Sequence, residues 1–170
     1  MQDKILLGFL MQGCQTGYAI KKQMEKSTNL FFNTSAGSIY PAFQKLEKEE
    51  LVTKEERLDG GRAKKIYTIT PKGKTVFKEW LNNDLPIGKI KQEALLRTFF
   101  FSHLPPAKRI DKLKNYIDEI TGKQNELIAL KKAIGHMEID QFQLAALQYG
   151  IDLYGFIIQW HNKFLEDLEQ

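Results

Sequence analysis

One stretch of the sequence, residues 35–73, restricts the possible folds of this chain more than any other. Its first part, residues 36–50, carries Ile39, Phe43 and Leu46 at the spacing that places them on one face of an α-helix. The opposite face is small, polar and basic, and serine residues at the start of the segment are suitable N-caps. We therefore expect an amphipathic helix that buries its apolar face and presents its polar face to a partner.

A β-hairpin is predicted directly after this helix. Its first strand begins at Leu51-Val52, and its second covers residues 66–70, which are mostly β-branched or aromatic. The Asp-Gly-Gly run at residues 59–61 predicts the turn, because glycine adopts the positive φ angles that tight hairpins need. Three cations follow this turn: Arg62, Lys64 and Lys65. The pattern indicates duplex DNA, with the helix in the major groove and the hairpin tip on the backbone or in the minor groove.

The same stretch resembles the PadR family of transcriptional regulators. The resemblance depends on the order and spacing of several short motifs: Ser38-Ile39-Tyr40-Pro41, Leu46-Glu47, Leu51-Val52, Gly61-Arg62, Lys65, Tyr67 and Thr70-Pro71-Lys72-Gly73. It covers the N-terminal half of the chain closely, and the C-terminal half only in its helical pattern. The resemblance implies a mainly α chain with a small β-hairpin, in which a winged helix-turn-helix domain precedes a helical dimerisation domain.

The sequence departs from the family pattern at Glu50, where the family usually has glycine before the Leu-Val that starts the wing. If the turn requires a positive φ there, a glutamate costs about 1 kcal/mol more than a glycine, because its Cβ atom crowds the backbone. We therefore predict the wing itself and leave its angle to the preceding helix open.

Two shorter helices are predicted before residue 36, so that three helices precede the hairpin. The first ends at Gly13, and Thr16-Gly17 opens the second. In the second helix we expect Tyr18 and Met24 to lie in the core. Its lysines are interpreted either as a solvated face or as contacts to the DNA backbone: Lys21, Lys22 and Lys26.

A further helix is predicted after the hairpin, with Thr70 as its N-cap and Pro71 as its first residue. A domain boundary is predicted in the segment of residues 82–88 that follows. It separates a winged-helix DNA-binding domain, residues 1–85, from a helical dimerisation domain, residues 86–170. The first domain holds 14 Lys or Arg against 10 Asp or Glu, whereas the second holds 11 of each. The excess positive charge therefore lies entirely in the half with the wing, as DNA binding requires.

The last predicted helix, from about residue 140 to residue 168, carries two adjacent apolar stripes. Two stripes need neighbours on two sides, and the C-terminal half offers few of them within the chain. We therefore expect a second copy of the chain to cover this helix, with Gly150 and Gly155 allowing its close approach. The residues assigned to this homodimer contact are Leu147, Ile151, Tyr154, Ile158 and Leu165. A homodimer also matches a pseudo-palindromic operator.

The residues expected to contact double-stranded DNA are Ser35, Gly37, Ser38, Tyr40, Lys45, Arg62, Lys64 and Lys65. The helix of residues 36–50 would contact base edges, and the wing of residues 58–65 would neutralise phosphates. Two alternatives remain. Tyr40 either reaches the DNA or buttresses Pro41, and a winged helix can also serve as a protein-interaction module that binds no DNA.

The resemblance also allows a small aromatic effector, because some PadR-like regulators respond to phenolic acids or flat hydrophobic drugs. The candidate pocket residues are Trp80, Phe99, Phe100 and Trp160. The competing interpretation is that these side chains are ordinary core residues.

Other classes of protein are disfavoured by the pattern. The three histidines are far apart and Cys14 has no catalytic companion, so we expect no metal site, no cofactor and no enzyme. No apolar run approaches the roughly 20 residues of a membrane span, and the balanced charge of the C-terminal half disfavours an interfacial helix. A single cysteine also fits a reducing compartment. Together with the resemblance to the PadR family, these patterns lead us to expect a cytoplasmic DNA-binding regulator, a homodimeric repressor.

Overall fold

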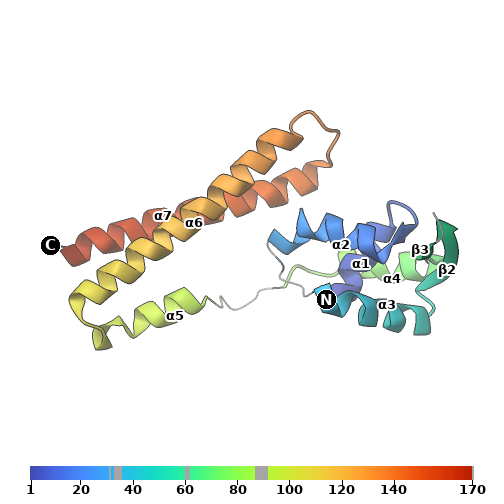
Figure 1. Ribbon diagram of the computed structural model, residues 1–170, viewed down its shortest axis with the longest axis horizontal. Helices are drawn as coiled ribbons and strands as arrows, with labels where there is room; N and C mark the ends of the chain where they lie inside the picture. Colours follow the sequence, from blue (N-terminus) through green and yellow to red (C-terminus); the bar gives the residue numbers. More distant parts are fainter. Residues whose placement is uncertain (31, 33–35, 60–61, 87–91, 170) are drawn as a thin grey trace. The chain divides into compact units, whose positions relative to one another are not determined.

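The computed structural model describes all residues of the protein except 31, 33–35, 60–61, 87–91 and 170. They divide into two compact units, within residues 1–87 and residues 88–170, and each unit is described by itself. The first unit contains helices and a small sheet, whereas the described part of the second is entirely helical (Figure 1).

The first unit has the element order expected of a winged helix. Its α-helices are α1 (Gln2–Leu10), α2 (Gly17–Glu25), α3 (Ile39–Lys48) and α4 (Pro71–Asn82). The short 3-10 helices η1 (Thr28–Leu30) and η2 (Ala36–Ser38) lie between α2 and α3 in the chain. The predicted helix of residues 36–50 is therefore η2 followed directly by α3.

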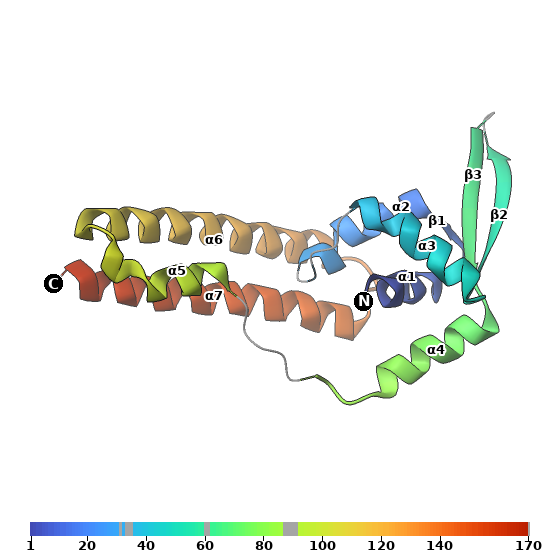
Figure 2. The same ribbon diagram turned by 90° about the horizontal axis from the view of Figure 1, so that it is seen from below.

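The sheet of the first unit is antiparallel, with the strand order β1-β3-β2. Its strands are β1 (Gln15–Thr16), β2 (Val52–Asp59) and β3 (Arg62–Ile69). β2 and β3 form the predicted hairpin, whose register pairs Val52 with Ile69 and Asp59 with Arg62. Residues 60 and 61 of the predicted turn lie outside the described residues. Figure 2 shows the hairpin extending beyond the helices of this unit, as a wing.

The core of the first unit is built on α3. Its predicted apolar stripe is confirmed, because Ile39, Phe43 and Leu46 expose only 2%, 0% and 0% of their surface. The Phe43 ring stacks on Tyr67 of β3, with 3.7 Å between the ring centroids. The other buried side chains come from neighbouring elements: Leu6, Leu7, Leu10, Ile20, Met24, Leu51, Val52 and Ile69. These contacts attach α3 to both the other helices and the wing.

Helix α2 turns a different side to the core than its sequence suggests. It buries Gly17, Ile20 and Met24, which follow the spacing of one helix face. Tyr18 is 63% exposed, and the Lys22 ammonium lies 5.7 Å from its ring centroid. The prediction that Tyr18 lies in the core is therefore wrong, because it points about 100° away from the buried side of the helix.

Helix α3 is followed by a residue in the left-handed backbone conformation. Glu50 has a φ of 59°, and it is the one non-glycine with a positive φ among the described residues. The Leu51 N–H donates to the Leu46 carbonyl at 2.9 Å, and the Glu50 N–H donates to the Glu47 carbonyl at 3.0 Å. These bonds define a Schellman cap, in which the left-handed position usually holds glycine. The turn before the wing therefore does require a positive φ of this glutamate.

The start of α4 is bonded to the same segment. The Thr70 hydroxyl donates to the Glu50 carbonyl at 2.8 Å and accepts the Gly73 N–H at 3.0 Å, as the predicted N-cap of α4. A Cβ atom at Gly73 would lie only 2.1 Å from the Leu51 carbonyl oxygen. Glycine is therefore needed here for the close approach of α4 to the start of the wing.

The second unit is a helical hairpin preceded by a short helix. Its elements are α5 (Glu93–Phe99), η3 (Phe101–His103), α6 (Pro106–Ile134) and α7 (Gln141–Glu169). α6 and α7 lie side by side and antiparallel in both views (Figure 1, Figure 2), and Lys114 pairs with Glu169 at 2.9 Å. The hairpin buries apolar residues from both helices: Leu113, Ile120, Leu127, Ile151, Ile157 and Leu165. None of the helices in the described part of the chain combines the length and apolar character needed to cross a membrane.

Helix α6 supplies a neighbour for α7 within the chain and covers one of its sides. Ile151 and Leu165, both assigned to the dimer contact, are each 9% exposed within the single chain. Leu147, Tyr154 and Ile158 are half-buried. The stripe that contains these five residues, the first apolar stripe, therefore packs largely against α6.

Gly150 and Gly155 also face α6 rather than open space. A Cβ atom at Gly150 would lie 3.0 Å from Cδ1 of Leu127, and one at Gly155 would lie 2.9 Å from Nε2 of Gln124. The Gln124 amide donates to the Ile151 carbonyl at 3.0 Å, across the same contact. The close approach expected for a second copy of the chain is therefore made by α6.

Candidate nucleic-acid interface

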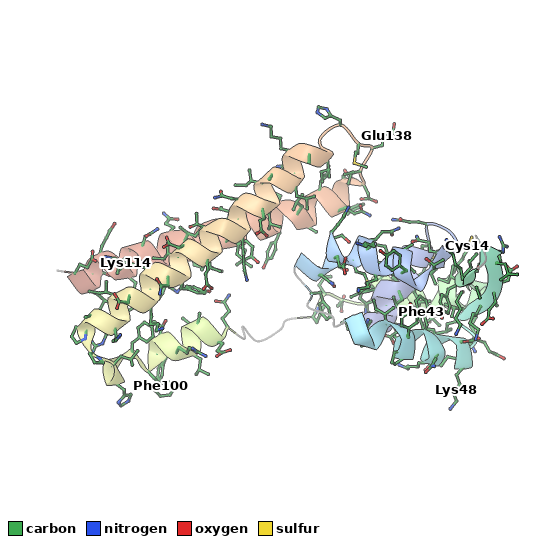
Figure 3. The ribbon with its side chains drawn as sticks, in the orientation of Figure 1. Cys14, Phe43, Lys48, Phe100, Lys114 and Glu138 are labelled. Carbon is green, nitrogen blue, oxygen red and sulfur yellow. The ribbon has the colours of Figure 1, made fainter. Side chains whose placement is uncertain are left out.

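Helix α3 and the turn before it present one open side. The exposed residues on this side recur at steps of three or four and form one stripe: Gly37, Tyr40, Pro41, Gln44 and Lys48. Figure 3 shows Phe43 pointing into the unit and Lys48 pointing away from it. The predicted contacts Gly37 and Tyr40 are therefore accessible. Gln44 and Lys48 were not among the predicted contacts, although their spacing from Tyr40 indicates that they share its side of the helix.

Two other predicted contacts, Ser38 and Lys45, are engaged by α1. The Ser38 hydroxyl donates a hydrogen bond to the side-chain carbonyl of Gln2. The Lys45 ammonium lies 3.4 Å from the Asp3 carboxylate and 3.9 Å from that of Glu49. In the protein without DNA, both side chains therefore help to attach α3 to α1.

The pair of Asp3 and Lys45 affects the titration of the carboxyl group. Burial alone would raise the pKa of Asp3, but hydrogen bonds and charges from the N-terminal amine and Lys45 outweigh it and lower the pKa below 3.8. The Lys45 side chain is 59% exposed, so water and salt screen the pair and its contribution to stability is small. A phosphate group could therefore replace Asp3 as the partner of Lys45 at little cost.

The wing places its predicted cations along β3. Lys64 and Lys65 are exposed, and the strand register sets them opposite Arg57 and Glu56 of β2. Arg57 is paired with Glu55 at 2.9 Å, along its own strand. The wing therefore carries cations on both strands, partly balanced by the acidic residues of β2.

A groove of about 460 Å³ joins the starts of α2, α3 and β3. Its lining consists of Thr16, Gly17, Tyr18, Tyr40, Ala63, Lys64 and Lys65. A Cβ atom at Gly17 would lie 3.3 Å from Cε1 of Tyr40, so the Tyr40 ring packs on the first residue of α2. The groove thus brings Tyr40 together with Lys64 and Lys65, and adds Tyr18. The other predicted contacts, Ser35 and the side chain of Arg62, lie outside the described residues.

The four residues predicted to line an effector pocket belong to different units. Trp80 lies in the first unit, where its ring centroid is 5.7 Å from that of Phe77. In the second unit, Phe99 and Phe100 make an edge-to-face contact at 5.0 Å, and both are exposed. Trp160 lies on α7 and is 40% exposed. The effector pocket therefore stays a prediction.

Comparison with known protein families gives matches to both halves of the chain. Residues 6–79 match the family described as "Transcriptional regulator PadR-like family". Residues 90–169 match the family described as "Virulence activator alpha C-term". The negative transcriptional regulator PadR of Bacillus subtilis is 30% identical to this chain over 124 residues, which cover 72% of this chain and 68% of that protein.

Solved structures of similar fold include two of Bacillus subtilis PadR. One is its complex with operator DNA, with a TM-score of 0.90 and 24% identity over 98% of each chain. The other is its complex with p-coumaric acid, with a TM-score of 0.84 and 22% identity over 99% of this chain and 98% of that chain. At these identities the likeness establishes the winged-helix fold with its helical extension.

Proposed function

The chain belongs to the PadR-like family of transcriptional regulators, and we propose that it binds operator DNA through α3 and the wing. The observation that carries this proposal is the groove in which Tyr40 of α3 meets Lys64 and Lys65 of β3. Side chains that the sequence pattern assigns to DNA from two separate elements line the same space. The chain is a regulator and not an enzyme, because the family and the relative that it matches are transcriptional regulators.

Each element has its own part in the proposed complex. An α-helix fits the major groove of B-DNA, so the open side of α3 would face the base edges. Lys64, Lys65 and Arg62 would then meet phosphates or the adjacent minor groove, and Lys45 would join them by exchanging Asp3 for a phosphate. These contacts supply affinity that falls as salt rises, because each neutralised phosphate releases counterions. We accordingly assign DNA binding to residues 1–85.

We assign homodimerisation to residues 86–170, because their helices keep large apolar side chains exposed. On α7, Tyr149, Phe156 and Trp160 are 66%, 62% and 40% exposed, and on α5 Phe99 is 79% exposed. A second copy of the chain carries the same apolar surface and would remove both surfaces from water. The half-buried residues of the first stripe would border this contact: Leu147, Tyr154 and Ile158. A two-fold symmetric dimer would present two α3 helices to a pseudo-palindromic operator.

The sign of regulation and the effector are proposed from the relatives of this chain. The Bacillus subtilis relative is named a negative regulator, which supports repression by this chain. The complex of Bacillus subtilis PadR with p-coumaric acid supports a small aromatic effector here. The proposed contacts for that effector are Trp80, Phe99, Phe100 and Trp160. A regulator acts in the compartment that holds the DNA, which supports a cytoplasmic location.

Binding of the purified chain to the DNA directly upstream of its own coding region is the test of the DNA proposal. Genomic fragments are the second set of probes, and the salt concentration is varied from about 50 to 200 mM. The Arg62→Ala, Lys64→Ala, Lys65→Ala triple variant is expected to bind more weakly and to lower the slope of log affinity against log salt by up to about 2.7. The matched control removes three exposed lysines of the second unit, by Lys112→Ala, Lys123→Ala and Lys163→Ala.

Equal losses in the wing variant and the control would show that only net charge matters, and would reject the assignment of the wing. If no duplex binds even at low salt, the DNA proposal is wrong and a protein-interaction module remains. The dimer proposal has a separate test in sedimentation at micromolar concentration. Phe156→Glu places a charge in the exposed stripe and should yield monomers, and a monomeric unaltered chain would contradict the proposal.

A further inference from the structure

We propose that Gln44 is the side chain of α3 that sets base preference, by pairing its amide with an adenine of the operator. This inference rests on the proposed DNA-binding function and names a residue that determines its specificity. Gln44 lies in the exposed stripe of α3, one helical turn after Tyr40 and one turn before Lys48.

The first argument is the engagement of its polar neighbours on α3. The Ser38 hydroxyl is bonded to Gln2, and the Lys45 ammonium is paired with Asp3, so both of these side chains are held toward α1. The Lys45 ammonium offers only hydrogen-bond donors, and it is assigned above to a phosphate. Neither residue is therefore the first candidate for discrimination between bases.

The second argument is the composition of the open side itself. Gly37 has no side chain, and no atom lies within 4 Å of the position that a Cβ atom would take there. Tyr40 packs on Gly17 and borders the groove with the wing lysines. Lys48, the last residue of α3, ends the stripe and adds a cation to those of the wing. Gln44 thus occupies the middle of the stripe, between Tyr40 and Lys48.

The third argument is the hydrogen-bonding state of the amide. The structure gives Gln44 no side-chain hydrogen bond to any described residue, whereas other glutamine amides are used internally. Gln23 donates to Gln15 at 2.8 Å, and Gln124 donates to the Ile151 carbonyl at 3.0 Å. The Gln44 amide is exposed and keeps both its N–H donors and its carbonyl acceptor for a ligand.

The donor and acceptor of one amide match one base edge in the major groove. Adenine presents the N7 acceptor beside the N6 donor, and a glutamine amide can satisfy both at once. Guanine presents two acceptors, N7 and O6, so the carbonyl of the amide would face an acceptor and lose its bond. A single A·T pair in each half of the operator is therefore expected to depend on Gln44.

The test begins with selection of duplexes from a random pool by the full-length protein, followed by binding assays in which each base pair of the selected site is changed. The unaltered protein should lose about 10-fold in affinity or more when the A·T pair in contact with Gln44 becomes G·C. Gln44→Ala should abolish this discrimination, and its loss of affinity should be confined to duplexes that carry the A·T pair. Gln44→Arg should shift the preference at the same pair toward G·C, because arginine pairs with N7 and O6 of guanine.

The control is Gln12→Ala, which removes an exposed amide in the turn after α1 and should leave the base profile unchanged. An unaltered base profile in Gln44→Ala overturns the inference while leaving the DNA-binding function intact. A uniform loss of affinity across all sequences also overturns it, since it would mark Gln44 as a backbone contact. If the unaltered protein binds no duplex at all, both the proposed function and this inference are wrong.

Discussion

The Glu50→Gly variant is expected to be more stable than the Glu50→Ala variant, the reverse of the order at an ordinary helix position. Glutamate and alanine both place a Cβ atom at the φ of 59°, which costs about 1–2 kcal/mol in the left-handed region. Glycine avoids this cost but loses about 0.4–1 kcal/mol through its more flexible unfolded chain. The glycine variant should therefore exceed the alanine variant by about 1 kcal/mol in unfolding free energy.

Comparison with alanine also removes the influence of the side chain. The Glu50 carboxylate lies 3.4 Å from the Lys72 ammonium and is 83% exposed, so this ion pair contributes little, and both variants lose it equally. The difference between the two variants therefore isolates the backbone strain at residue 50. A difference of about 1 kcal/mol corresponds to a shift of about 4–8 °C in the melting temperature of a domain of this size.

The assay is urea unfolding of the full chain in a Trp160→Phe background, so that fluorescence of Trp80 reports on the first unit. Lys78 provides the control, because it is exposed within α4. At that position the glycine variant should be about 1 kcal/mol less stable than the alanine variant. If glycine is also the less stable residue at position 50, the strain argument for Glu50 is refuted.

Two further perturbations in the first unit test a close backbone contact and the ion pairs of Asp3. Gly73→Ala should lower the unfolding free energy of the first unit by about 3 kcal/mol, because the new Cβ atom would lie 2.1 Å from the Leu51 carbonyl oxygen. The control is Gly122→Ala in α6 of the second unit, where the added Cβ atom meets open space and should stabilise the helix by about 1 kcal/mol. Asp3→Asn should lower the stability of the first unit near neutral pH and should flatten the loss of stability in acid. The pKa of Asp3 is lowered in the folded state, so the contribution of its carboxylate is complete above the ordinary pKa of 3.8 and is lost as the pH falls through the folded-state pKa. Urea unfolding from pH 2 to pH 7 measures this, and an unchanged acid profile would contradict the role of the pairs that Asp3 makes with the N-terminal amine and with Lys45.

Local patterns were enough to predict the α-helices and the β2–β3 hairpin of the first unit, whereas the two-residue strand β1 was not predicted. The spacing of Ile39, Phe43 and Leu46 identified the buried side of α3, and Thr70 was recognisable as the N-cap of α4 from its place before a proline. Glu50 stood out because the motif around it normally has glycine there. The resemblance read from these residues is confirmed by the family match over residues 6–79.

The candidate interface was less predictable, because it depends on which neighbour each side chain meets. Ser38 and Lys45 belong to the polar surface of α3 in sequence, yet Gln2 and Asp3 of α1 hold them. Gln44 lies on the open side, a distinction that requires the position of α1. The same reason applies to Tyr18, whose exposure follows from the side of α2 that packs on the core.

The C-terminal helices show most clearly that the spacing of apolar residues does not predict which partner covers them. The repeat of apolar residues establishes that α7 has two sides to cover, because residues three and four apart share a face. Apolar contact is non-directional, so the same stripe accepts a neighbour from its own chain or from a second copy. Tertiary structure made that choice for the first stripe: α6 approaches at Gly150 and Gly155 and encloses Ile151, while Tyr149, Phe156 and Trp160 of the second stripe stay exposed.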